Sequence, residues 1–174
     1  MSKNIVNEFE YLDIVDENDN VVGKDTKDNK FAKELISRNI ACFVSNDKGQ
    51  ILIVKRSPNK KSFPNRYDLA ACGNVKSGET YEEAAKREIK EELGVDCPIK
   101  ALKKLFNRFE ENGKKLRYFT TIFQGKWNGG VKLNEELTEL KKMSIAEVEK
   151  KIKENGDLFT PGFINDFNEV KNTL

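Results

Sequence analysis

Residues 73–95 read GNVKSGETYEEAAKREIKEELGV, and this segment carries most of the information in the chain. Glu91 and Glu92 follow Glu88 by three and four residues. In a helix this spacing places the three side chains on one face, where each pair of like charges repels by roughly 0.2–0.5 kcal/mol. Such a cluster persists if water screens the charges or if a cation binds them.

The apolar residues around the glutamates separate these two explanations. At about 100° per residue, Ile89 and Leu93 share one arc of the helix, and Glu88 and Glu92 fall inside that arc. Glu91 lies at its edge. A buried carboxylate is costly unless it is paired or coordinates a metal. The pattern therefore favours a cation site over a solvated acidic face.

The ends of this helix are also readable. Thr80 and Glu83 form a T-x-x-E capping box at the start. Gly94 is a natural C-terminal cap, because glycine adopts the left-handed conformation without a steric penalty. We therefore expect a loop over residues 73–79, followed by a helix with the glutamates in its last two turns.

The segment matches the Nudix box at every specified position. Gly73 is followed by five residues, Glu79, seven residues and then REIKEELGV at 87–95. The chain thus resembles the Nudix (MutT-like) hydrolases. The resemblance implies an α/β fold, an α/β/α sandwich with a mixed β-sheet. It also implies a hydrolase that uses Mg²⁺ or Mn²⁺ to cleave a diphosphate linkage in a nucleoside diphosphate derivative or a similar small molecule.

The resemblance assigns metal ligands within the box. Glu88, Glu91 and Glu92 are expected to bind the metal, together with the backbone carbonyl of Gly73. Carboxylate and carbonyl oxygens are the ligands that Mg²⁺ prefers. The chain has no histidine, so imidazole cannot serve as a ligand or a base.

The other catalytic roles are assigned less narrowly. Arg87 is expected to support catalysis by pairing with Glu79, and the alternative is a surface pair with Glu91. Within the box, Glu79 and Gly94 have structural roles. The general base is either Glu91 or Glu136, which lies in the acidic segment 133–139. The alternative is that the acidic residues of that segment are solvated charges of a loop and take no part in catalysis.

A finer resemblance points to the isopentenyl-diphosphate isomerase branch of the family. Residues 13–19, 56–64 and 159–162 carry it, and in the second segment Arg56 and Lys60 become candidates for binding the substrate diphosphate. A basic solvated loop is the alternative. Cys72 and Gly73 match the isomerase Cys-Gly pair, but the metal-binding histidines are absent. The isomerase is therefore the second candidate, and a non-catalytic nucleotide-binding domain is the third.

Composition bounds the remaining possibilities. The chain has 174 residues, which suits a single domain over 1–174. Its 31 basic and 29 acidic residues give a net charge of +2, so nothing indicates a nucleic-acid or membrane partner. No run of about 18 apolar residues is present. Without a secretion signal, three unpatterned cysteines favour the cytoplasm. The oligomeric state stays open, with a homodimer among the options.

Local patterns predict the other elements. Turn residues and alternation predict an N-terminal hairpin over 10–25 and a longer one with strands 101–110 and 115–125. Further strands are expected at 39–45, 50–56, 67–72 and 137–143, with a helical turn at 31–37. C-terminal helices are expected within 144–174, one from Ser144 to about residue 154 and one beginning at Thr160 and Pro161.

Overall fold

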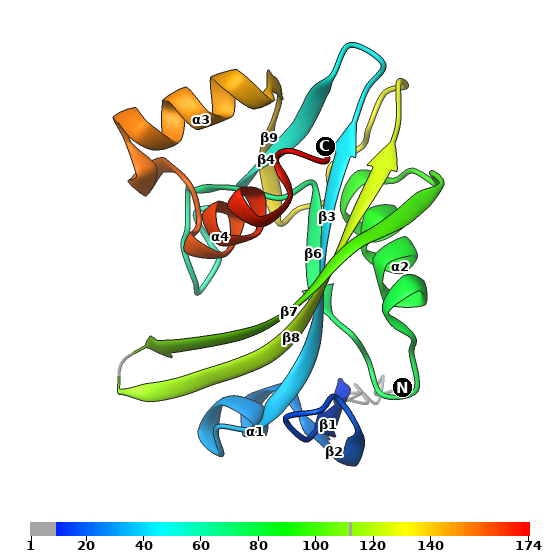
Figure 1. The fold of residues 1–174 in the computed structure, drawn as a ribbon, viewed down its shortest axis with the longest axis vertical. Coiled ribbons are helices and arrows are strands. Elements are labelled where there is room, and N and C mark those ends of the chain that lie inside the picture. Colours follow the sequence, from blue (N-terminus) through cyan, green and yellow to red (C-terminus); the bar gives the residue numbers. More distant parts are fainter. Residues whose placement is uncertain (1–9, 112) are drawn as a thin grey trace, which may run out of the picture.

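The computed structural model describes residues 10–111 and 113–174 (Figure 1). The strands are β1 (Tyr11–Val15), β2 (Val21–Thr26), β3 (Ile36–Ser45), β4 (Gln50–Arg56), β5 (Tyr67–Asp68), β6 (Ala71–Asn74), β7 (Ile99–Glu111), β8 (Lys114–Lys126) and β9 (Leu137–Ser144). The helices are α1 (Lys27–Ala32), α2 (Tyr81–Leu93), α3 (Ile145–Glu154), the 3-10 helix η1 (Gly156–Leu158) and α4 (Pro161–Val170).

Strand β3 is the centre of a mixed sheet. It pairs in parallel with β8, whose other edge pairs antiparallel with β7. On its other side β3 pairs antiparallel with β4 at one end and with β6 at the other. Strands β5 and β9 both pair with β4. Strands β1 and β2 form a separate hairpin.

Both faces of this sheet are buried, and the alternation of residues along β3 shows how. Ile40, Cys42 and Val44 face the core beneath α2, whereas Ala41 and Phe43 face the core beneath α3 and α4. Successive side chains of a strand point to opposite faces, so a continuous apolar run serves two cores. Helices thus cover both faces of the sheet, and the expected α/β/α sandwich is confirmed (Figure 1).

Helix α4 closes the second core with a row of aromatic rings. Thr160 caps it, accepting a hydrogen bond from the N–H of Phe163, and Pro161 is its first residue, as predicted. Phe163 and Phe167 are fully buried with their ring centroids 5.8 Å apart. Phe43 of β3 lies 5.9 Å from the Phe163 ring. The packing of these rings fixes the start of α4 beside β5.

The structure confirms the predicted hairpins and both C-terminal helices. It also confirms the strands at 39–45, 50–56 and 137–143, and all of these elements end within three residues of the predicted bounds. Two local predictions are wrong, and the loop expected over residues 73–79 begins two residues later, because Gly73 and Asn74 pair with β3 as the end of β6. The helical turn expected at 31–37 is α1, which begins after the cap Thr26, while residues 36–38 extend β3 because they pair with Arg117–Phe119 of β8. The strand expected at 67–72 is two strands, because its halves pair with β4 and β3 respectively.

Within residues 10–111 and 113–174, no helix combines the length and apolar character needed to cross a membrane.

Candidate active site

Helix α2 places the three glutamates, and its two ends are built as the sequence predicts. The Thr80 side chain accepts from the Glu83 N–H while the Glu83 carboxylate accepts from the Thr80 N–H. Gly94 has a φ of 68°, in the left-handed region, and its N–H donates to the Lys90 carbonyl. Both ends are therefore fixed, which holds the last two turns of α2 against the sheet.

The burial of the glutamates follows the predicted helical arc. Glu92 is 9% exposed, and the Glu88 side chain is 13% exposed. The Glu91 side chain is 52% exposed, at the edge of the arc. Two carboxylates are thus turned toward the interior, and the third lies beside them at the surface.

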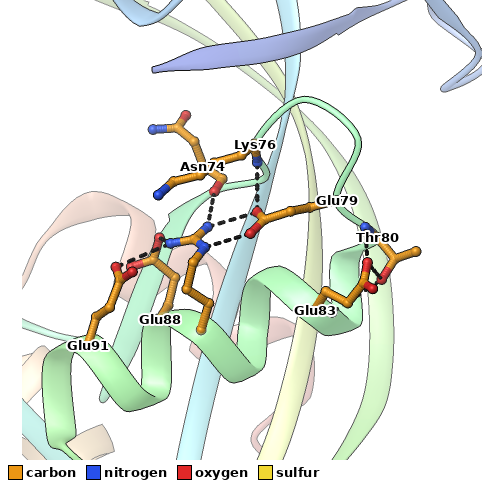
Figure 2. Close-up of polar contacts among 8 residues, drawn as sticks. Asn74, Lys76, Glu79, Thr80, Glu83, Glu88 and Glu91 are labelled. Atoms are coloured by element: carbon orange, nitrogen blue, oxygen red, sulfur yellow. Dashed lines mark hydrogen bonds and ion pairs between the residues drawn. The ribbon is translucent and has the colours of Figure 1, made fainter. Parts of the chain in front are cut away.

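Arg87 connects the helix to the loop that precedes it (Figure 2). Its Nε and Nη2 donate to the two oxygens of Glu79, at 2.7 and 2.9 Å. Nη2 also donates to the Asn74 carbonyl at 3.0 Å. Nη1 donates to Glu88 at 2.6 Å and to Glu91 at 3.3 Å. The expected pair with Glu79 and the alternative pair with Glu91 are both present.

The pair with Glu79 is the stronger of the two, because it is bidentate and half-buried. Glu79 also accepts from the N–H of Lys76, which closes the loop between β6 and α2. The hydrogen bonds from Arg87 hold the pKa of Glu79 below its ordinary value. This clamp fixes residues 73–79 relative to the acidic face of α2.

At Gly73, any larger side chain would displace the carboxylate of Glu88. A Cβ atom at this position would lie 2.2 Å from Oε1 of Glu88. The close approach brings the backbone of β6 against the Glu88 carboxylate. The requirement for glycine is therefore steric at this position.

Glu92 is a buried carboxylate that no cationic side chain reaches within the described residues. Its recorded donor is the backbone N–H of Cys72, at 3.3 Å. Burial, together with the negative charge of Glu88, raises the pKa of Glu92 well above its ordinary value. Burial also raises the pKa of Glu88, although Arg87 opposes that shift. A divalent cation would remove this electrostatic cost, and the all-oxygen donor set suits a hard cation.

The carboxylates do not yet converge as a set. In the described part of the chain, no three acidic or thiol side chains lie close enough together to hold an ion as they stand. Glu88 and Glu91 both accept hydrogen bonds from Nη1 of Arg87 instead. Cation binding at this site therefore requires these two side chains to turn from Arg87.

The glutamates form one wall of a polar cleft of about 230 Å³, and basic residues line the other wall. Arg56, at the end of β4, donates to Asp68 at 3.0 Å and to the Ser62 carbonyl. Lys60, in the loop after β4, forms an ion pair with Glu136, in the loop before β9. The structure thus brings Arg56, Lys60 and Glu136 to the same cleft as the glutamates of the box.

Several residues that line or shape the cleft carried no usable sequence signal. Lys27 of α1, Lys76 of the box loop and Asn134 line it. Lys30 is buried and donates to the Asn74 side chain at 3.1 Å, and burial lowers its pKa to about 8. Only Lys76 could have been found from the box, as one of its variable positions. The others reach the cleft through tertiary packing.

Cys72 also lines the cleft, half-buried beside Gly73. Burial raises the pKa of its thiol well above the ordinary value. A thiolate nucleophile is therefore disfavoured at this position.

The chain belongs to the Nudix family, because the family profile described as the NUDIX domain matches residues 36–163. Members of this family generally use divalent metal ions. The crystal structure of DR0079 from Deinococcus radiodurans superposes with a TM-score of 0.69 and 30% identity, covering 84% of this chain and 90% of that one.

Relatives of known sequence agree with this assignment. A Nudix hydrolase of Deinococcus radiodurans is 45% identical over 87 residues, so the match spans about half of either protein (50% and 51%). An uncharacterized Nudix hydrolase of Listeria monocytogenes is 30% identical over 94% of this chain and 96% of its own length.

Two further relatives have more specific names. A protein of Methanosarcina mazei named prenyl-diphosphate phosphatase is 30% identical over 89% of this chain and 94% of its own length. A protein of Photorhabdus laumondii named isopentenyl-diphosphate Delta-isomerase 2 is 28% identical over 88% of each chain.

Proposed function

We propose that this protein is a metal-dependent hydrolase that cleaves a diphosphate linkage in a small molecule. The observation that carries the proposal is the buried carboxylate of Glu92, beside Glu88 and across the cleft from Arg56 and Lys60. A cation site facing two basic side chains matches the charge pattern of a metal–diphosphate complex.

The residues present fit a divalent cation. Glu88, Glu91 and Glu92 would hold it with the carbonyl of Gly73, and oxygen-only donors favour Mg²⁺ or Mn²⁺. When bound, the cation neutralises phosphate oxygens and lowers the pKa of an attacking water. Arg87 then keeps its bidentate bond to Glu79 and holds the loop in place.

The basic wall binds and orients the diphosphate. Arg56 is already fixed by Asp68, so it is pre-organised to donate to a phosphate oxygen. Lys60 must exchange Glu136 for the substrate. That exchange frees the Glu136 carboxylate at the cleft, where it or Glu91 accepts the proton of the attacking water. The water oxygen bonds to phosphorus, the bond from phosphorus to the leaving oxygen breaks, and the proton held by the carboxylate passes to the leaving oxygen, which restores the base.

The comparison with the Methanosarcina mazei protein supports an organic diphosphate ester as substrate, beside the nucleoside diphosphate derivatives indicated by the family resemblance. We further propose a cytoplasmic location, which suits the three free cysteines. A small-molecule substrate is the expected partner, and a homodimer stays an open option.

The test measures release of phosphate or pyrophosphate from a panel of diphosphates, with Mg²⁺, with Mn²⁺ and with a chelator. We expect turnover only with metal, and a loss on the order of 100-fold or more in Glu92→Gln. Glu82→Gln is the matched control, because Glu82 lies on the same helix but pairs with Lys86 at the surface. Turnover in chelator, or full activity in Glu92→Gln, would refute the proposal. Binding of a nucleotide without turnover would favour the non-catalytic domain.

The isomerase is the second candidate, favoured by Cys72 in the cleft wall and by the Photorhabdus laumondii relative. We expect no isomerisation, because Asn74 stands where the isomerase has a histidine and the chain has none. The assay incubates the protein with isopentenyl diphosphate and Mg²⁺ and looks for the dimethylallyl isomer. Formation of that isomer, abolished by Cys72→Ser, would make the isomerase the correct function.

A further inference from the structure

A second hollow, of about 310 Å³, lies beside the catalytic cleft and is mainly apolar. Its apolar surface comes from Phe63, Phe109, Leu116, Tyr118 and Pro161, and Glu110 stands at its rim. These residues belong to the loop after β4, to the β7–β8 hairpin and to the start of α4, which approach one another in Figure 1. We call this hollow the apolar groove.

The strand register explains why the floor of the groove is apolar. Phe109 of β7 is directly opposite Leu116 of β8, and opposed residues share one face of the sheet. Tyr118 follows on the same face of β8, with its ring 6.1 Å from that of Phe109. Phe109 remains 37% exposed. The hairpin therefore presents aromatic surface that the core of the described chain does not cover.

A third hollow, of about 320 Å³, joins the groove to the catalytic cleft. It shares Arg56, Lys60 and Cys72 with the cleft, and it shares Phe63 and Tyr118 with the groove. The three hollows thus adjoin one another through shared lining residues, and we call them together the trough. Along β8 the distance from Thr120, in the middle hollow, to Leu116 is about 14 Å, at roughly 3.4 Å per residue.

Two polar side chains of the middle hollow, Thr120 and Asp166, accept hydrogen bonds from residues outside its lining. Asn107 donates to Thr120 at 3.0 Å, and Asn165 donates to both Asn107 and Asp166. Burial raises the pKa of Asp166 to about 7, which reduces its negative charge near neutral pH. An apolar chain that crosses the middle hollow would therefore lie against hydrogen-bonded polar groups and against Oδ1 of Asn39, which has no partner within the described residues.

We propose that the apolar groove binds the hydrocarbon portion of a diphosphate monoester whose diphosphate lies between Arg56 and Lys60. The inference rests on the proposed function, and it assigns the substrate class of the same site. The shared lining of the three hollows carries it, since one molecule with a charged head and an apolar tail spans both ends. The tail gains affinity in proportion to the apolar area it buries, without directional bonds.

A nucleobase is the competing occupant. It would stack on Tyr118 and donate an amino hydrogen to Oδ1 of Asn39, a buried acceptor with no partner in the described part of the chain. Such a ligand would use the middle hollow and leave Phe109 and Leu116 uncovered. The two occupants therefore depend on different residues.

The test compares kcat/KM for dimethylallyl, geranyl and farnesyl diphosphate, with ADP-ribose as the nucleoside diphosphate derivative. We expect kcat/KM to rise at least ~10-fold from the shortest to the longest chain, because each methylene in an apolar pocket contributes measurably. Phe109→Ser should reduce the ratio of long-chain to short-chain kcat/KM toward one. Val22→Ser, an exposed apolar position on β2, should preserve that ratio.

Leu116→Asn provides a second variant should Phe109→Ser fold poorly, and it should reduce the same ratio. A wild-type ratio near one, an unchanged ratio in both groove variants, or a higher kcat/KM for ADP-ribose than for every prenyl diphosphate would overturn the inference while leaving hydrolysis itself intact. Absence of metal-dependent turnover with all four substrates would overturn the inference, whereas only absence of turnover across the wider panel of diphosphates would also overturn the proposed function.

Discussion

At the scale of single residues, the burial of Glu92 affects stability as well as the metal binding that we propose. Its pKa is raised in the folded state, so the folded protein binds a proton there more tightly than the unfolded chain does. The stability of the metal-free protein therefore falls as pH rises from about 4.5 through the folded pKa. Glutamine at this position does not titrate and escapes that loss.

We accordingly expect metal-free Glu92→Gln to be at least as stable as the wild type at pH 7, with the difference shrinking toward pH 4. Urea unfolding in chelator at several pH values measures it. Glu82→Gln, at an exposed position, should show no such pH-dependent gain. If Glu92→Gln unfolds at pH 7 without metal, Glu92 stabilises the fold and is not an unpaired carboxylate of a cation site.

Gly73 gives a second residue-scale prediction. Alanine at this position would force the Glu88 carboxylate to move, because its Cβ would lie 2.2 Å from Oε1. We expect Gly73→Ala to weaken Mn²⁺ binding at least about 10-fold with the far-UV spectrum unchanged. Gly130→Ala is the control, since nothing lies within 4 Å of a Cβ there and its φ is not positive. Unchanged Mn²⁺ affinity in Gly73→Ala would argue against a site beside Glu88.

The identity of the general base gives a third residue-scale prediction. Removing a base typically lowers the rate by about 10²–10⁴. If Glu136 is the base, Glu136→Gln lowers kcat by that factor with Mn²⁺ affinity retained, and Glu91→Gln mainly weakens Mn²⁺ binding. If Glu91 is the base, Glu91→Gln lowers kcat with Mn²⁺ affinity retained and Glu136→Gln has little effect. Metal titration and steady-state kinetics on both variants distinguish these two outcomes. If both variants retain kcat, neither Glu91 nor Glu136 is the base.

At the scale of elements, a row of buried aromatic rings packs α4 against the sheet. Phe163 is fully buried between Phe159, Phe167 and Phe43. We expect Phe163→Ala to lower the free energy of unfolding by about 3–5 kcal/mol, because it leaves a cavity that the surrounding rings cannot fill. Leu158→Ala, at a 40% exposed position nearby, should change it by less than about 0.5 kcal/mol. Denaturant unfolding measures the free energy of unfolding of both variants. Equal losses in Phe163→Ala and Leu158→Ala would contradict this packing.

Elements with a local chemical signature were predictable from the sequence. The capping box at Thr80, the helix start at Ser144 and the glycine cap at Gly94 are set by residues close in sequence, and they lie where expected. The limits of β3 and the division of residues 67–74 into β5 and β6 depend on partners far along the chain. Local propensity could not supply those partners, since strand pairing is a tertiary property.

The candidate site shows the same division. The acidic wall lies on one helix, so 3.6-residue periodicity was enough to place Glu88 and Glu92 toward the interior. The contacts on the opposite wall join Arg56 to Asp68 and Lys60 to Glu136, and the second pair is 76 residues apart in the chain. Lys27, Lys30 and the apolar groove had no sequence signal, because only the folded sheet brings them to the cleft.

At the scale of the whole molecule, our central claim is that the buried glutamate face of α2 is a divalent-cation site opposite a diphosphate-binding wall. Calorimetric titration of Mn²⁺ into the wild type, Glu92→Gln and Glu82→Gln tests it most directly. We expect the wild type and Glu82→Gln to bind Mn²⁺ with the same affinity and Glu92→Gln to bind at least about 10-fold more weakly. Equal Mn²⁺ affinity in all three proteins, or no binding to the wild type, would contradict the claim.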